Sequence, residues 1–109
     1  MPGDDDGHPA PSRRDLDDRY GAVAELFGAL ATPVRAAIVH ALSEGNRTVS
    51  DLVDELGISQ PLASQHLRTL RAAGLVESER LGRSICYRLS DENVAHVFLD
   101  ALTHSHEHA

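Results

Sequence analysis

The sequence predicts a small, mainly α-helical domain with one β-hairpin, acting as a homodimer. Apolar residues recur at helical spacing along most of the chain after residue 15, and glycines follow several of these runs. Apolar and polar residues alternate on both sides of "LGR" at residues 81–83, which is typical of a hairpin. The chain has only 109 residues, so its own core is small and a second subunit would add buried apolar surface.

The first predicted helix follows a polar arm. Residues 1–15 are rich in proline, glycine and aspartate and lack apolar periodicity, so we expect them to be disordered. From there to about Ala31, apolar residues share one face of a helix. That face is formed by Val23, Leu26, Phe27 and Leu30.

Three further helices have clear start and stop signals. Thr32 caps the second helix, which ends before Gly45. Ser50 is the expected cap of "DLVDEL", which Gly57 ends, and Ser59 caps "QPLASQHLRTLRAAG". Two short helices joined by "GIS" form the helix-turn-helix pattern, whose second helix usually enters the major groove of DNA.

A hairpin and a last helix complete the domain. "LVESERLGRSICYRL" predicts two strands with Gly82 in the turn, and a final helix from about Asp91 to His106 carries an apolar stripe suited to a dimer seam. A helix-turn-helix followed by a hairpin is a winged helix, here with five helices plus the wing. We therefore expect a DNA-binding and dimerisation domain at residues 16–107 and a short tail at 108–109.

The charge distribution separates an acidic arm from a basic segment. The net charge is −7 and the first eighteen residues hold six aspartates, yet residues 59–90 carry five arginines against two glutamates. A local basic surface of this kind suits nucleic acid. The sequence has no signal peptide or membrane-length apolar run, which predicts a cytoplasmic protein without membrane partners. Its single cysteine, Cys86, is expected to point inward as a small core residue.

The predicted recognition helix offers short polar side chains near its start. Amide and hydroxyl groups there can reach base edges, whereas an arginine one turn further along meets phosphate. Arginines on the hairpin would contact the DNA backbone or the minor groove. The predicted DNA-binding residues are Ser59, Gln60, Ser64, Gln65, Arg68, Arg80 and Arg83.

The last helix collects four of the seven histidines, a pattern that suggests metal binding. His104 lies on one helix face with Glu107 and with His108. Asp91 and His104 are about 20 Å apart along the helix and cannot share one ion, unless a partner's antiparallel helix brings the two ends together. Imidazole and carboxylate without thiolate suit zinc, nickel or cobalt. Solvated terminal histidines without a role are the alternative.

Three stretches together resemble the ArsR/SmtB family of bacterial metal-responsive transcriptional regulators. They are "LATPVRAAIVHAL", "LGISQPLASQHLRTLRAAGLVESERLGRSICYRL" and the terminal histidine-bearing helix, so the likeness extends from about Val23 to Glu107. The resemblance implies a homodimeric winged helix that occupies an operator in double-stranded DNA and changes its DNA affinity when metal binds. Most members of the family are repressors released by metal.

The resemblance also implies a ligand set on the last helix. Members that sense metal there carry D-x-H, ten residues, and H-x-x-H or H-x-x-E, with the two pairs on different subunits. Asp91, His104 and Glu107 match this pattern, but Asn93 stands where the second ligand is histidine, and His96 could take its place. A site richer in nitrogen and oxygen donors favours nickel or cobalt over zinc, as in the nickel-sensing branch. Further candidate ligands are His106, His108 and, in the arm, His8.

Other functions are expected to show different features. An enzyme would need a nucleophile with its base or a cofactor fingerprint, and the sequence contains neither. A winged-helix regulator controlled by a protein partner would leave the histidine tail incidental. A metal carrier or buffer would bind no operator. His40 and His66 lie near predicted packing surfaces and are expected to be structural.

Overall fold

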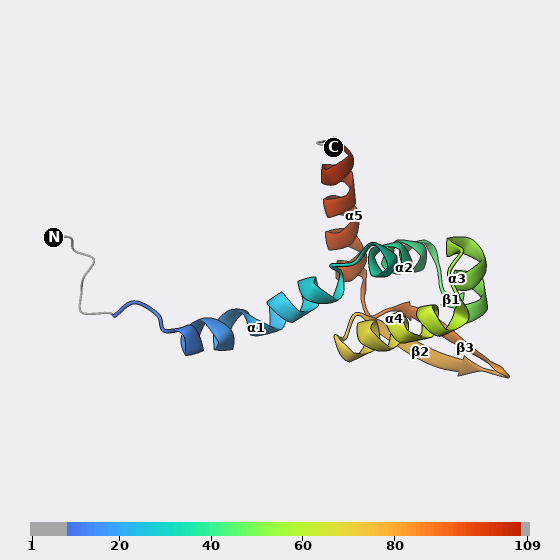
Figure 1. The fold of residues 1–109 in the computed structure, drawn as a ribbon, viewed down its shortest axis with the longest axis horizontal. Helices are drawn as coiled ribbons and strands as arrows, with labels where there is room; N and C mark the ends of the chain where they lie inside the picture. Colours follow the sequence, from blue (N-terminus) through green and yellow to red (C-terminus); the bar gives the residue numbers. More distant parts are fainter. Residues whose placement is uncertain (1–8, 108–109) are drawn as a thin grey trace.

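A computed structural model of the chain describes residues 9–107 and contains five helices and three strands. The predicted winged-helix fold is confirmed (Figure 1). In chain order the elements are α1 (Arg13–Ala29), α2 (Pro33–Glu44), β1 (Arg47–Thr48), α3 (Val49–Leu56), α4 (Gln60–Ala72), β2 (Val76–Leu81), β3 (Ser84–Leu89) and α5 (Glu92–Glu107).

Helix α1 begins at Arg13, so its first three residues fall inside the predicted arm. The start is set by a capping box, in which the Ser12 hydroxyl accepts a hydrogen bond from the Asp15 backbone N–H at 3.2 Å and the Asp15 carboxylate accepts one from the Ser12 N–H at 3.1 Å. These bonds satisfy groups that a helix N-terminus leaves without partners. The sequence pattern did not predict this cap, because the apolar periodicity that indicated the helix begins only after residue 15.

Helix α3 starts one residue after Thr48, so the predicted cap at Ser50 is wrong. The Thr48 hydroxyl accepts a hydrogen bond from the Asp51 N–H at 3.1 Å, and the Asp51 carboxylate accepts one from the Thr48 N–H at 2.9 Å. Thr48 and Ser50 are both residue types that can cap a helix, but only Thr48 has an acidic residue three positions later that closes a capping box. These hydrogen bonds lower the pKa of Asp51, led by the one from the Thr48 backbone.

The capping box makes the stability of the fold pH-dependent. Because the pKa of Asp51 is lowered in the folded state, its contribution is present above the ordinary value of 3.8 and is lost as the pH falls through the folded-state value. Asp51→Ala should therefore destabilise the protein at neutral pH, and the difference from wild type should shrink below the ordinary value. Denaturant unfolding between about pH 7 and pH 2.5 measures this. Asp54→Ala, on the same helix, is the control, and a pH-independent difference for Asp51→Ala would contradict the expectation.

The wing is a three-stranded antiparallel sheet in the order β1-β3-β2. The sequence predicted the hairpin of β2 and β3 and missed β1, whose two residues pair with Tyr87 and Cys86. A strand of two residues is too short to show an alternating pattern. In the turn between β2 and β3, Gly82 has φ +64°, a conformation that favours glycine, as predicted for this position.

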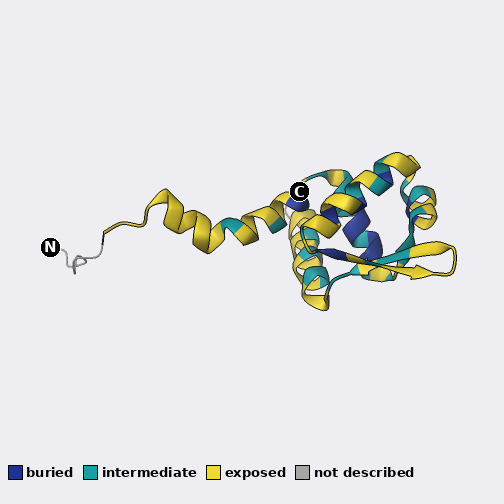
Figure 2. Ribbon diagram, turned by 90° about the horizontal axis from the view of Figure 1, so that it is seen from below, coloured by how far each residue is buried: buried dark blue, intermediate teal, exposed yellow. Residues whose placement is uncertain are grey.

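The core lies between α2, α3, α4 and the start of β2. Figure 2 shows its buried residues in dark blue on the central helices. Tyr87 and Leu89 of β3 pack against this core, whereas Cys86 is only half-buried on the alternate side of the strand, so its predicted core position is wrong. The core residues with the least exposure are Ile38, Val39, Leu52, Leu67, Leu70 and Leu75.

Helices α1 and α5 project from this body. Helix α1 extends away on one side and α5 rises on another (Figure 1), and nearly all of α1 is exposed (Figure 2). Within residues 9–107, no single helix is long and apolar enough to cross a membrane. Of the described helices, α1 and α2 taken together, across a bend of 87°, reach that length and apolarity, and Ile38 and Val39 of α2 belong to the core.

Candidate nucleic-acid interface and metal-binding helix

The first turns of α4 present the predicted base-reading residues. Gln60, Gln65 and Arg68 are exposed and Ser64 is half-buried, while Ala63, Leu67 and Leu70 face the core. Ser59 caps the helix, because its hydroxyl accepts a hydrogen bond from the Leu62 N–H at 3.2 Å. The amphipathic pattern therefore turns the polar side of α4 outward, as a recognition helix requires.

A polar groove of about 470 Å³ separates the start of α4 from the wing. It brings Gln60 and Ser64 together with Arg83 from the hairpin turn. Gln65, Arg68 and Arg80 do not line this groove, although all three are exposed. The β1–α3 junction and β3 also contribute to the groove, and this was not predicted because only the sheet pairing places them there. These missed lining residues are Thr48, Val49, Ser50, Ser84, Ile85 and Tyr87.

The wing carries fewer available positive charges than the sequence suggests. Arg88 is ion-paired with Glu77 at 2.8 Å and with Glu79 at 3.5 Å, because β2 and β3 pair in a register that sets them side by side. Arg80 and Arg83 are exposed near the hairpin turn. The basic surface at the wing is therefore concentrated at its tip, where it can reach a DNA backbone.

The described candidate metal ligands are spread along the α5 region, from Asp91 to Glu107. Among residues 9–107, no three His, Cys, Asp or Glu side chains gather to hold an ion. One oxygen of Asp91 accepts a hydrogen bond from the Val94 N–H at 3.2 Å, so Asp91 caps α5 and still has a second oxygen. The exposed candidates on α5 are Asn93, His96, His104, His106 and Glu107. His8 and His108 lie outside the described residues.

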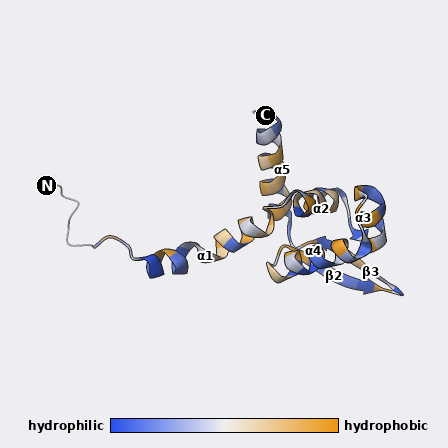
Figure 3. Cartoon of the chain, viewed as in Figure 1, coloured by the Kyte–Doolittle hydropathy of each residue, from blue (hydrophilic) through white to orange (hydrophobic). Residues whose placement is uncertain are grey.

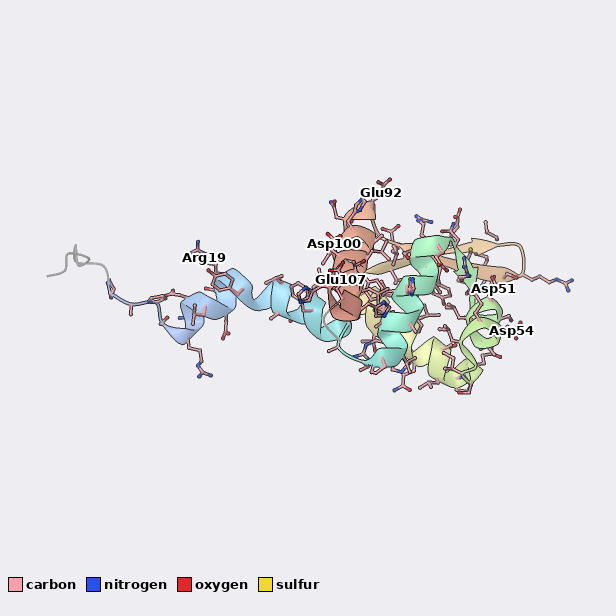
Figure 4. All side chains as sticks on the ribbon, turned by 90° about the horizontal axis from the view of Figure 1, so that it is seen from above. Arg19, Asp51, Asp54, Glu92, Asp100 and Glu107 are labelled. Atoms are coloured by element: carbon pink, nitrogen blue, oxygen red, sulfur yellow. The ribbon has the colours of Figure 1, made fainter. Side chains whose placement is uncertain are left out.

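The donor set on α5 nevertheless fits a metal shared between two subunits. Figure 4 shows Glu92, Asp100 and Glu107 along α5, away from Asp51 and Asp54 on α3. The acidic groups of the two helices therefore lie on different parts of the surface. Imidazole and carboxylate groups are ligands for zinc, nickel and cobalt. Because Asp91 stands at the start of α5 and His104 near its end, an ion would need one group from each of two antiparallel helices.

An unpartnered apolar stripe runs along α1. Leu16, Tyr20, Val23 and Phe27 recur every three or four residues and are all substantially exposed. Near the end of α1, Val23 and Phe27 share an apolar cavity of about 260 Å³ with Asp91, Asn93 and Val97 of the α5 region. Figure 3 shows apolar colour on the last part of α1 and along α5. The apolar pattern of the sequence predicted a dimer seam on the last helix alone, without α1.

Two histidines outside α5 have partners within the fold, consistent with the structural role expected for them. The His40 ring lies 5.8 Å from the Phe98 ring and its Nε2 is 4.0 Å from the Glu44 carboxylate. His66 on α4 contacts Arg35 of α2 through its Nδ1 atom at 3.2 Å.

The known proteins that are similar to this chain are transcriptional regulators. Residues 32–78 match the family model described as bacterial regulatory protein, arsR family. The transcriptional repressor SmtB of Mycobacterium tuberculosis is 52% identical over 101 residues, spanning 93% of this chain and 73% of that protein. The transcriptional regulator NmtR of the same organism is 44% identical, over 83% of this chain and 76% of that protein. A homodimeric winged helix-turn-helix DNA-binding domain from Mycobacterium bovis superposes with a TM-score of 0.79 at 32% identity, covering 93% of each chain.

The recognition helix, the wing and these similarities define a DNA-binding transcriptional regulator of the winged helix-turn-helix class, not an enzyme. The chain belongs to the ArsR family of bacterial regulatory proteins. The resemblance stated from the sequence is confirmed.

Proposed function

We propose that this chain is a homodimeric, metal-responsive repressor whose operator affinity changes when nickel or zinc binds between the two α5 helices, with cobalt as a further candidate. The observation that carries the metal assignment is the α5 donor set, in which Asp91 and the His104–Glu107 pair lie at opposite ends of one exposed helix. Similarity to regulators named SmtB and NmtR supports the assignment. Such a regulator would act on DNA in the cytoplasm, with residues 16–107 as one binding and dimerisation unit.

The mechanism couples two surfaces through the arrangement of the subunits. Ligands from both subunits favour one relative position of the α5 helices, and that position sets the spacing of the two α4 helices. Two recognition helices bind successive major grooves only at a matching spacing. Of the α5 donors, Asp91 and Asn93 lie nearest the apolar end of α1, so metal binding and dimer packing involve adjoining residues.

The test combines DNA and metal titrations. A duplex recovered by selection from a random library, called here the selected duplex, replaces the unknown operator. Its affinity for the dimer is measured with and without Ni²⁺ or Zn²⁺, and the metal affinity is measured calorimetrically with and without the duplex. Thermodynamic linkage requires the two ratios to be equal.

Each alternative outcome rejects a defined part of the proposal. Equal metal affinity with and without the duplex would reject the coupling. If metal binds tightly but the affinity for the duplex is the same with and without it, regulation by a protein partner is favoured. Metal binding without any duplex binding near physiological salt would favour a metal carrier.

The proposed dimer makes a separate prediction about α1. Phe27 and Leu81 have the same exposed fraction, 54%, but Phe27 belongs to the α1 stripe and Leu81 to the wing. Phe27→Ala should weaken dimerisation at least about tenfold, because a symmetric dimer loses two buried rings. Analytical ultracentrifugation over a concentration series measures the dissociation constant. Leu81→Ala is the matched control, and equal effects of the two substitutions would contradict a seam that includes α1.

A further inference from the structure

Arg35 joins three helices through a single side chain. It stands in the first turn of α2, half-buried, where Pro33 and the Thr32 cap fix the start of the helix. Its Nε donates a hydrogen bond to the Ala29 carbonyl oxygen at the end of α1, at 2.7 Å. Its Nη1 is 3.2 Å from Nδ1 of His66 in α4. One guanidinium therefore connects the projecting helix to the recognition helix.

Among the described residues, Arg35 makes the one side-chain link between α4 and the two helices α1 and α2. A cleft of about 300 Å³ opens between α1 and α4, with Arg35 in its wall alongside Gly28 and Thr69. Among residues 9–107, no other side-chain hydrogen bond or ion pair joins α4 to α1 or α2. Apolar packing of Leu67 and Leu70 holds α4 on the core, and the Arg35–His66 contact adds a directed bond at the flank of the helix.

The contact requires one tautomer of His66. A guanidinium carries donors only, so Nδ1 of His66 must be unprotonated and must accept the hydrogen bond. The ring proton then lies on Nε2. His66 stands directly after Ser64 and Gln65, two residues that are predicted to contact DNA. The orientation of these predicted reading residues is thus linked to a bond made by the same helix.

We propose that Arg35 is a positioning residue for DNA recognition: it fixes the rotation of α4 relative to α1 through the Ala29 carbonyl and the Nδ1 atom of His66. The inference rests on the DNA-binding part of the proposed function and is independent of the metal. Base-edge contacts depend on orientation, whereas phosphate contacts from arginines tolerate small rotations. Loss of the link should therefore lower specific binding and leave non-specific binding unchanged.

The experiment measures affinity for the selected duplex and for a scrambled duplex. Arg35→Gln and His66→Gln should each lower specific affinity about tenfold, with unchanged non-specific affinity and salt dependence. His66→Asn should retain most of the affinity, because its carbonyl oxygen replaces Nδ1 as the acceptor. The double variant Arg35→Gln with His66→Gln should bind no worse than Arg35→Gln alone.

A matched control separates positioning from general stability. Arg47→Gln breaks the ion pair of Arg47 with Glu55, which lies at 2.5 Å and does not involve α4. It should reduce the free energy of unfolding while keeping the ratio of specific to non-specific affinity. Unfolding curves for every variant show whether each remains folded under the binding conditions.

The outcomes distinguish the link from the broader function. Additive losses in the double variant, or an unchanged affinity ratio in Arg35→Gln and His66→Gln, would overturn the proposal. The ¹⁵N chemical shifts of the His66 ring in the DNA-free dimer should show a proton on Nε2, and a proton on Nδ1 would also overturn it. If the wild type selects no duplex, the DNA-binding function fails, and the ring tautomer still decides whether the Arg35–His66 bond exists.

Discussion

Replacing His104 with alanine is expected to lower the affinity for Ni²⁺ or Zn²⁺ by more than about 100-fold, because even the outer-shell partners of metal ligands are worth 10–100-fold. His104 is exposed in the last turns of α5, one helical turn before Glu107, so the two side chains share a face. In a two-fold dimer, both sites lose this ligand at once. The effect of metal on duplex affinity should disappear with it.

Calorimetric titration of wild type and His104→Ala measures this loss, with duplex affinity in the presence and absence of metal as the second readout. Thr103→Ala is the matched control, since it changes the neighbouring exposed position of the same helix. The DNA affinity of metal-free His104→Ala should equal that of the metal-free wild type. Undiminished metal binding by His104→Ala would remove His104 from the site and assign the ion to other histidines of the tail.

Gln65→Ala should lower affinity for the selected duplex by about 10–100-fold, because an amide paired with a base edge contributes roughly 1–3 kcal/mol of discrimination. Gln65 is exposed on α4, on the side turned away from Leu67 and Leu70. The loss should be confined to one base pair of the duplex, and variants of that pair should become nearly equivalent. Fluorescence anisotropy with a set of single-base variants measures the preference.

Arg83 provides the contrasting case at the wing tip. Arg83→Gln should weaken binding to all sequences alike and reduce the slope of affinity against salt by about one, as expected for one lost phosphate contact. Arg88→Gln is its control on the same hairpin, because Glu77 and Glu79 already neutralise Arg88. If Gln65→Ala weakened binding uniformly and Arg83→Gln changed base preference, the assignments of reading and positioning roles would be reversed.

Local signals in the sequence predicted most elements of the fold. Thr32, Ser59, Gly57 and Gly82 act where they were expected, because caps and turns depend on residues within a few positions of one another. The exceptions are also local in origin. The start of α3 was misplaced because Thr48 and Ser50 are both good caps, and the capping box with Asp51 decides between them.

The candidate site was predicted less completely than the fold. Gln60, Ser64 and Arg83 were named from the sequence and do meet at one groove, but the part of that groove formed by Thr48 and Tyr87 depends on β1 pairing with β3. Arg88 was counted in the basic segment by composition, but the cross-strand register pairs it with Glu77, which the sequence did not reveal. Among residues 9–107, no three potential ligands gather, so an ion shared between two subunits is part of the proposal.

The sequence by itself determined the order of the helices, the hairpin and the outward polar face of α4, since these follow from periodicity and capping within short windows. Only the tertiary structure decided which residues far apart in the chain became neighbours. Arg35 reached both Ala29 and His66, β1 joined the wing, and the apolar side of α1 was left without a cover. The reason is physical: such contacts depend on how helices pack in three dimensions, and no spacing along a single element encodes that geometry.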